Sequence, residues 1–164
     1  STTHVDNNDS SSNNSDEQTL TTQIKATIDQ LIKDAAIDSY AVFVEDGTIL
    51  ALSDKLDCVT SEETRSLIRL FDDEQDAFTN GIVLNEKLYE VHRWFDKSEP
   101  ALIYGRTTID SQNSLDSEGC ALSRTRTTHS GIHVYIAIVY KMPTLSAKAV
   151  SALVDYTKKV VEPL

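Results

Sequence analysis

The sequence predicts an α+β fold in which a central, mostly antiparallel β-sheet lies between helices. Apolar residues recur at helical spacing near both ends of the chain, and runs rich in β-branched and aromatic residues, separated by turn formers, lie between them. The last such run, residues 132–140, is apolar on both faces of its alternation. A strand of this kind is covered on both faces, so we expect helices on both sides of the sheet.

The length and composition predict one domain with an N-terminal extension. The chain has 164 residues, of which 40% are hydrophobic, which is enough for one core and too short for two ordinary domains. Residues 1–18, "STTHVDNNDSSSNNSDEQ", are mostly Ser, Asn and Asp and contain no Lys or Arg. Such a stretch cannot bury enough apolar surface to offset the entropy of ordering it. We therefore predict a disordered acidic extension over 1–18 and a folded domain over 19–164.

The first half of the domain reads as a helix, a hairpin and a second helix. An apolar stripe from Leu20 to Ala35 predicts a helix from Thr19 to about Ala36. The runs "SYAVFV" (39–44) and "TILALS" (48–53) flank an Asp-Gly pair that suits a tight turn. Thr60 and Glu63 have capping-box spacing and predict a helix over 61–71, which the acidic run "DDEQD" then ends.

The second half reads as strands followed by a closing helix. Strands are predicted over 81–85, 88–94, 101–107, 120–127 and 132–140, with a polar loop over 108–118. Apolar residues from Leu145 to Val154 recur at helical spacing, and Lys158 and Lys159 suit the C-terminal end of that helix.

Net charge and cysteine content limit the possible partners of the protein and the cellular compartment in which we expect it. The formal net charge of -11 makes nucleic acid and anionic membranes poor partners. The sequence shows no secretory signal and no apolar run long enough to span a bilayer. Cys58 and Cys120 lack metal-ligand spacing and suggest free thiols in a reducing compartment. We therefore expect a cytoplasmic protein.

A search for catalytic chemistry points away from an enzyme. The chain has no Gly-rich phosphate loop and no paired cysteines, and no local arrangement singles out a nucleophile. His4, His92, His129 and His133 are too scattered to predict a metal site, and "DDEQD" lacks the glycine and the terminal glutamate of a calcium loop. We expect no cofactor and no metal, which leaves a binding module.

Several local strings follow one another along the chain before the closing helix: "DGTILALS" (46–53), "EETRSLIRLFDD" (62–73), "FTNGIVLNEKLYEVHR" (78–93), "ALIYGR" (101–106) and "ALSRTRT" (121–127). Together they resemble the profilins, which bind actin monomers, over about residues 20–162. The resemblance implies terminal helices on one face of the sheet and shorter helices on the other. It also implies a monomeric, cytoplasmic protein of the actin cytoskeleton that binds monomeric actin and regulates its polymerisation.

The resemblance carries site residues as well. Phe78 and Arg93 match family contacts with actin, His92 lies beside them, and Arg106 and Lys148 fall where the next strand and the C-terminal helix meet actin. Arg124 and Arg126 lie two apart on a strand and are expected to extend the basic surface. Such a patch would let an otherwise negative protein dock on acidic actin.

The proline-rich peptide site departs from the family pattern. Ile24, Thr27 and Leu50 stand where the family usually has Trp, Tyr and Trp, and Tyr156 stands where it has a ring or imidazole. We therefore expect weak polyproline binding, or binding through a rearranged set that includes Tyr156 and Tyr40. The net charge argues against phosphoinositide binding. These departures point to a divergent, archaeal-type member.

Two further hypotheses come from the sequence. The acidic segment 1–18 is tethered close to both expected binding surfaces and would weaken partner binding. The alternative hypothesis is an inert tail that only increases solubility. The alternative fold is a roadblock or longin-like domain, which also has a mixed sheet flanked by helices and regulates small GTPases. That class would give Arg93 no special role.

Overall fold

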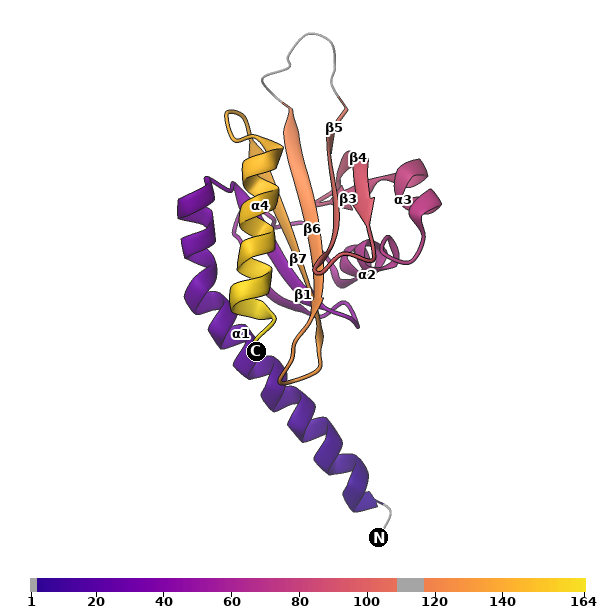
Figure 1. The fold of residues 1–164 in the computed structure, drawn as a ribbon. Coiled ribbons are helices and arrows are strands. Elements are labelled where there is room, and N and C mark those ends of the chain that lie inside the picture. The colour runs from indigo at the N-terminus through magenta and orange to yellow at the C-terminus, as the bar shows by residue number, and fades with distance from the viewer. Residues whose placement is uncertain (1–2, 109–116) are drawn as a thin grey trace.

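The strands of the protein form one antiparallel sheet in the order β2-β1-β7-β6-β5-β4-β3 (Figure 1). The structure, a computed structural model, describes residues 3–108 and 117–164, and the side chains it describes begin at Ser15. The predicted loop over 108–118 lies mostly at 109–116, outside the described residues. The strands are β1 Ser39–Val44, β2 Ile49–Leu52, β3 Ile82–Leu84, β4 Lys87–Phe95, β5 Ala101–Thr107, β6 Glu118–Arg126 and β7 His133–Lys141.

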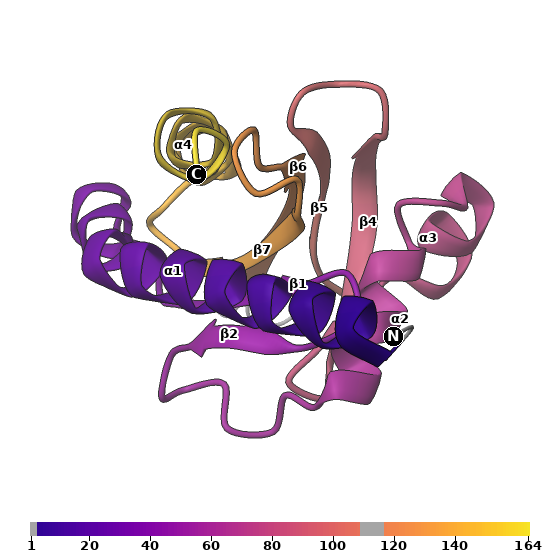
Figure 2. The same ribbon diagram turned by 90° about the horizontal axis from the view of Figure 1, so that it is seen from below.

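Helix α1 (Thr3–Ala35) covers one face of the sheet together with α4 (Ser146–Tyr156) and its π-helical continuation η2 (Thr157–Val161). Figure 2 shows α1 and α4 on the same side of the strands. We call this side the terminal-helix face. Its core is made by Leu20, Ile24, Ile28 and Leu31 of α1, Leu153 of α4, and Ile136 and Ile138 of β7, among others.

Helix α1 begins earlier than the sequence predicts. It starts at Thr3 instead of Thr19, and its N-terminal part projects beyond the sheet (Figure 1). The structure thus continues the helix through the segment that we predicted to be disordered. Packing nevertheless begins with the predicted stripe, because Leu20 is the first buried residue among the described side chains. The division between an extension and a domain near residue 18 therefore stays a prediction.

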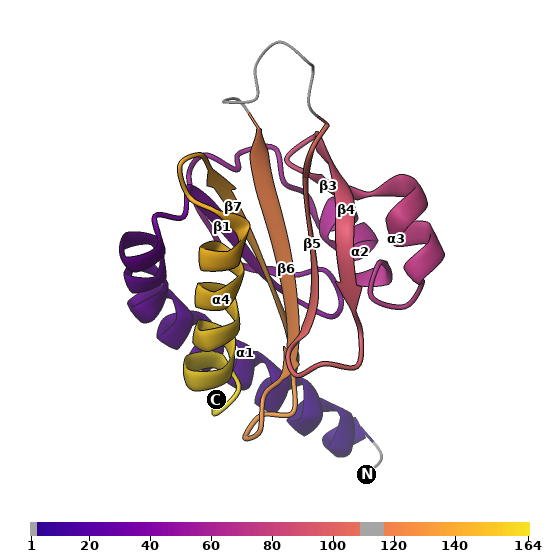
Figure 3. The same ribbon diagram turned by 45° about the horizontal axis from the view of Figure 1, so that its top comes forward.

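The opposite face is covered by two short helices, α2 (Ser61–Arg69) and α3 (Glu74–Asn80), which lie on the same side in Figure 3. We call it the short-helix face. Its core includes Leu67 and Phe71 from α2 and the residues after it, Ala77 of α3, and Phe43, Ile103, Leu122 and Tyr135 of the sheet. The predicted arrangement of terminal helices on one face and shorter helices on the other is confirmed.

Helix α3 is absent from the prediction, which read "DDEQD" as the solvated end of α2. In the structure the Asp73 carboxylate accepts a hydrogen bond from the Asp76 backbone N–H at 3.1 Å and caps a new helix. Glu74 and Asp76 suit its N-terminal turn because the helix dipole is positive there. The helix has only seven residues, too few to show a clear apolar period.

Strand β7 bears out the pattern from which the fold class was predicted. Val134, Ile136 and Ile138 pack on the terminal-helix face, whereas Tyr135, Ala137 and Val139 pack on the short-helix face. β7 lies between β1 and β6 at the centre of the sheet. Among the described residues, no helix is both long and apolar enough to cross a membrane.

Candidate partner-binding surface

Part of the terminal-helix face has no helix over it. Helices α1 and α4 pack over the half of the sheet that holds β2, β1, β7 and β6, while β4 and β3 lie at the other edge (Figure 3). Strand pairing places one row of side chains from β3, β4 and β5 on this uncovered area. We call it the open sheet face, formed by Val83, Leu88, Glu90, Arg93, Phe95, Tyr104 and Arg106.

The centre of the open sheet face is apolar. Val83 and Leu88 are paired across β3 and β4, and their exposed fractions are 42% and 52%. Farther along β4, Phe95 is 45% exposed, and on the adjoining helix α3 Phe78 is also 45% exposed. Exposed large apolar side chains, such as the Val83–Leu88 pair on this uncovered area, are typical of a protein–protein interface.

A tight turn holds the β3–β4 hairpin in place. Asn85 and Glu86 both have positive φ, 54° and 64°, as a two-residue turn of this type requires. The carboxylate of Glu63 in α2 accepts hydrogen bonds from the backbone N–H groups of both turn residues. Thr60 caps α2 as predicted, but Glu63 leaves the predicted capping box and supports the hairpin instead.

A β-bulge separates the two halves of β4. Val91 pairs with Gly105 and Arg93 with Tyr104, so His92 is the extra residue. Because of this irregularity, Arg93 lies on the open sheet face beside Tyr104 while Trp94 turns to the short-helix face and donates its indole N–H to the Leu70 carbonyl at 2.8 Å. Trp94, the last residue of the predicted strand 88–94, is therefore structural.

Arg93 is exposed and available to a partner. Within the described chain, the guanidinium makes one hydrogen bond, to the His92 carbonyl at 3.0 Å, and no ion pair. His92 is exposed next to it. The structure thus leaves Phe78, His92 and Arg93 exposed, and their role as partner contacts stays a prediction.

Arg106 is partly buried and is held by neighbouring side chains. Its guanidinium carbon lies 5.7 Å from the centre of the Tyr140 ring, and its nitrogens donate to the Ser117 and Ser146 hydroxyls at 3.4 and 3.2 Å. These contacts tie β5 to the first turn of α4, where Lys148 is exposed. Arg106 therefore positions one border of the open sheet face more than it offers a free charge.

Arg124 and Arg126 are not part of the same surface. They share one face of β6, as predicted, but Arg124 lies opposite Ala101 and packs over Phe71 on the short-helix face, with its guanidinium carbon 5.0 Å from the ring centre. Strand alternation places Arg93 and Arg106 on the other side of the sheet. The expectation that these two arginines extend one basic patch is therefore wrong in its geometry.

The groove between α1 and α4 corresponds to the expected peptide site. A cavity of about 540 Å³ lies there, and its lining includes Thr27, Leu31, Tyr156, Lys159 and Val160. The Thr27 and Tyr156 hydroxyl oxygens are 2.8 Å apart and share a hydrogen bond. Burial raises the pKa of Tyr156, so its hydroxyl stays protonated.

Three other residues predicted for peptide binding are not on this groove. Ile24 is 0% exposed and Leu50 is 8% exposed, so both belong to the core and cannot stack on a ligand. Tyr40 is half-buried and does not line the cavity. Of the five residues, only Thr27 and Tyr156 are placed together by the fold.

No cluster of three or more metal-ligating side chains occurs in residues 15–108 and 117–164. The fold and the open sheet face define a class, namely a small α+β domain whose sheet is covered by terminal helices on one face and short helices on the other, with an uncovered area at one edge.

Comparison with known proteins identifies the family. The profilin family model matches residues 22–160, so the chain belongs to the profilin family. No relative was found among curated protein sequences. The match does not favour the roadblock or longin-like alternative.

Solved structures of profilins have the same fold. Acanthamoeba castellanii profilin IA aligns with a TM-score of 0.62 at 20% identity, over 81% of this chain and 94% of that one. Schizosaccharomyces pombe profilin aligns with a TM-score of 0.58 at 24% identity, over 82% and 96%. LokiProfilin1, solved in a complex with rabbit actin, aligns with a TM-score of 0.55 at 16% identity, over 86% and 96%.

The residues that sequence reasoning missed are the apolar ones. Val83 and Leu88 were assigned to strands but not to a surface, and Phe95 lies one residue past the predicted strand 88–94. A signal was present, because Val83 alternates with the inward-facing Ile82 and Leu84 and must therefore point away from their core. Whether a helix covers that other side depends on where α4 packs. The strand pattern holds no information about the position of α4.

Proposed function

We propose that the protein binds monomeric actin in the cytoplasm through the open sheet face and so regulates actin polymerisation. The observation that carries the proposal is the exposed Val83–Leu88 pair, with Arg93 free on the same uncovered area. Family membership and the actin complex of LokiProfilin1, which has the same fold, support this choice of partner. The protein acts by binding and needs no catalytic group.

The character of the surface explains how it would bind an acidic partner. The apolar centre supplies most of the affinity, because hot spots of interfaces are buried, well-packed side chains. Arg93 on β4, together with Lys148 on α4, offers positive charge on a molecule whose net charge is -11. Such local complementarity sets orientation and speeds association more than it adds affinity.

Polymerisation of pyrene-labelled actin tests the proposal. The wild-type protein should slow spontaneous nucleation. Leu88→Ser and Arg93→Glu should each weaken monomer binding about tenfold or more, as expected at an interface hot spot. Lys25→Glu is the matched control for the charge reversal, because Lys25 is exposed on α1, away from this face.

A nucleation rate that wild-type protein leaves unchanged would overturn the proposal, and is what a roadblock or longin-like regulator of GTPases would give. Equal affinity in Arg93→Glu and Lys25→Glu would remove Arg93 from the interface.

We further propose that proline-rich peptides bind weakly in the α1–α4 groove. Tyr156 is the one aromatic residue that lines the groove in the described chain, whereas a polyproline helix is recognised by several stacked rings. The single tryptophan, Trp94, packs on the other face, so its fluorescence will not report binding. A titration with decaproline, followed by NMR, should shift the signals of Thr27 and Tyr156 in wild type, and no such shifts should occur in Tyr156→Ala. Tight binding would contradict the proposal of weak binding.

The N-terminal extension is proposed to weaken partner binding. Residues 3–18 form the first part of α1, and later residues of the same helix form one wall of the groove. Deletion of residues 1–18 should strengthen binding of actin, of decaproline, or of both. Unchanged affinity for both would leave the extension as an inert tail.

A further inference from the structure

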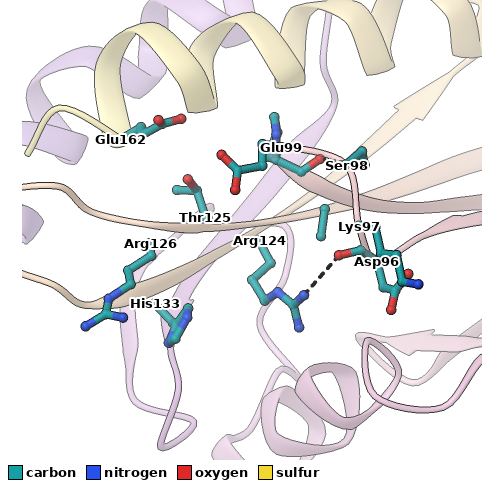
Figure 4. Close-up of a pocket in the computed structure, with 11 residues that line it drawn as sticks. Asp96, Lys97, Ser98, Glu99, Arg124, Thr125, Arg126, His133 and Glu162 are labelled. Atoms are coloured by element: carbon teal, nitrogen blue, oxygen red, sulfur yellow. Dashed lines mark hydrogen bonds between the residues drawn. The ribbon is translucent and has the colours of Figure 1, made fainter.

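A second polar cavity lies at the end of the sheet, away from the α1–α4 groove. It forms because β5 begins at Ala101, opposite Arg124, while β6 continues to Arg126 beside β7. The loop of residues 96–100 bounds the space that β5 leaves open, and the cavity has a volume of about 410 Å³. We call it the sheet-end pocket (Figure 4). It shares no residue with the open sheet face.

Two arginines line the sheet-end pocket and have no carboxylate partner in the described chain. Arg124 is held by its contact with the Phe71 ring, by a 3.4 Å hydrogen bond to the Asp96 carbonyl and by the neighbouring Tyr135 hydroxyl, none of which neutralises its charge. Arg126 is exposed beside His133, with which it is paired across β6 and β7. By contrast, three lysines at the opposite end of the sheet are all paired with carboxylates.

The other wall of the pocket carries the opposite charge. Figure 4 shows Glu99 and Glu162 on one side of the β6 strand and the guanidinium groups of Arg124 and Arg126 on the other. A ligand with concentrated negative charge, such as phosphate, would be attracted by one wall and repelled by the other. A peptide on the arginine side of β6 avoids this conflict, because its acidic side chains meet the arginines while its neutral backbone can lie toward the glutamates.

The spacing of the two arginines further limits which peptides can bind. Arg124 and Arg126 are alternate residues of one strand, so their Cα atoms are about 7 Å apart and their side chains leave the same face. A peptide in an extended conformation presents residues i and i+2 with the same spacing. Two carboxylates at i and i+2 therefore match two guanidinium groups, each of which can bind a carboxylate through two hydrogen bonds.

From this geometry we propose that the sheet-end pocket binds an extended acidic peptide with acidic residues at positions i and i+2. The partner is a protein segment of this chemistry, and the pocket gives the molecule a binding site beyond actin and proline-rich peptides. The site does not depend on the proposed actin function, since neither surface contributes residues to the other.

The experiment is an NMR titration with three blocked peptides, acetyl-Gly-Glu-Thr-Glu-Gly-amide, its Gln-Thr-Gln counterpart, and acetyl-Gly-Glu-Glu-Thr-Gly-amide. The first should shift the amides of Arg124, Arg126 and His133 and bind about tenfold more tightly than the Gln peptide. The adjacent-glutamate peptide should be weaker than the first. Inorganic phosphate is titrated in parallel.

Arg126→Gln should lose about tenfold in affinity for the Glu-Thr-Glu peptide, whereas Lys158→Gln, which removes an exposed charge from η2, should not. Arg126 forms no hydrogen bond within the described chain, so its variant should fold normally. Arg124→Lys keeps the positive charge but loses the planar guanidinium group, which makes two hydrogen bonds to a carboxylate. This variant should also weaken binding.

Equal shifts with the Gln peptide, equal binding by Arg126→Gln and Lys158→Gln, or shifts outside the pocket would overturn the proposal. Shifts with phosphate but not with the Glu-Thr-Glu peptide would also overturn it, and would leave a simple anion site.

Discussion

Glu63 shows how one side chain connects a buried scaffold to the open sheet face. Its carboxylate holds the backbone N–H groups of Asn85 and Glu86, and so fixes the turn between the strands that carry Val83 and Leu88. The Asn85 side chain continues the connection by accepting from the Cys58 backbone N–H at 2.7 Å. The exposed apolar pair thus rests on a hydrogen-bonded support.

Replacing Glu63 by alanine should lower the free energy of unfolding by about 1–3 kcal/mol, because hydrogen bonds to a charged acceptor are among the stronger ones. Urea denaturation measures the change, and Glu62→Ala is the control, since Glu62 is exposed in the same turn of α2. Actin binding should weaken further than stability alone explains, as the turn loosens. Equal stability of the two variants would show that water replaces the carboxylate without cost.

At the scale of the element, the bulge in β4 determines which way its last residues point. If β4 were regular, so that His92 paired with Tyr104, Arg93 would lie on the short-helix face and Trp94 on the opposite face. The partner strand accommodates the bulge with a glycine. A Cβ added at Gly105 would lie 1.7 Å from the backbone oxygen of Glu90 and 2.9 Å from the Cα of Val91.

Gly105→Ala should therefore cost several kcal/mol, about 3 or more, because the backbone of β4 has to move to relieve the overlap. Thermal unfolding gives the loss. NMR spectra should show shifts concentrated in residues 90–94 and 104–106. A variant with normal stability and an unchanged β4 would mean that the strands separate easily at this point, and that the bulge does not need the glycine.

At the scale of the whole molecule, a chain of ion pairs crosses the end of the sheet opposite the sheet-end pocket. Lys55 binds Asp38 at 2.8 Å, Lys87 binds Glu118 at 2.9 Å, and Lys141 lies 3.9 Å from Asp38 and 3.4 Å from Glu118. These residues belong to the segments before β1 and after β2 and to strands β4, β6 and β7. The network therefore joins both halves of the sheet.

The network makes stability depend on pH through Glu118. Partial burial alone would raise the pKa of Glu118, but hydrogen bonding and charge attraction from Lys87 and Lys141 outweigh it, and the pKa is lowered. The folded protein thus favours the ionised carboxylate. This contribution is fully present above about pH 4.5, the ordinary value for a glutamate, and is lost as the pH falls through the lowered pKa.

Glu118→Gln should lower the free energy of unfolding by about 1 kcal/mol near pH 7, a modest amount because the lysines are partly exposed to solvent. The difference from wild type should vanish at acidic pH. Chemical denaturation from pH 7 to pH 3 tests this, with Glu74→Gln as the control because Glu74 is exposed on α3. If wild type and Glu118→Gln lose stability in parallel as the pH falls, Glu118 does not carry the effect.

Much of this molecule was predictable from local pattern. The stripe from Leu20 to Ala35 and the two-faced apolar run of β7 correctly predicted a sheet with helices on both sides. Phe78 and Arg93, which the family resemblance assigned to a partner surface, are both exposed, and their role stays a prediction. The prediction did not include α3, whose seven residues are specified by an acidic cap instead of by apolar spacing.

Local sequence patterns predicted most of the elements and the side of each strand that faces a core, because the periods of helix and strand are local. Only the tertiary structure decided which of those faces stays uncovered and which arginines remain unpaired. Ile24 and Leu50 became core, Arg106 was held by two serines and a tyrosine, and Arg124 and Arg126 were turned away from Arg93. Each of these outcomes depends on the register of strands and the docking of α4, contacts between residues far apart in the chain that no short stretch encodes.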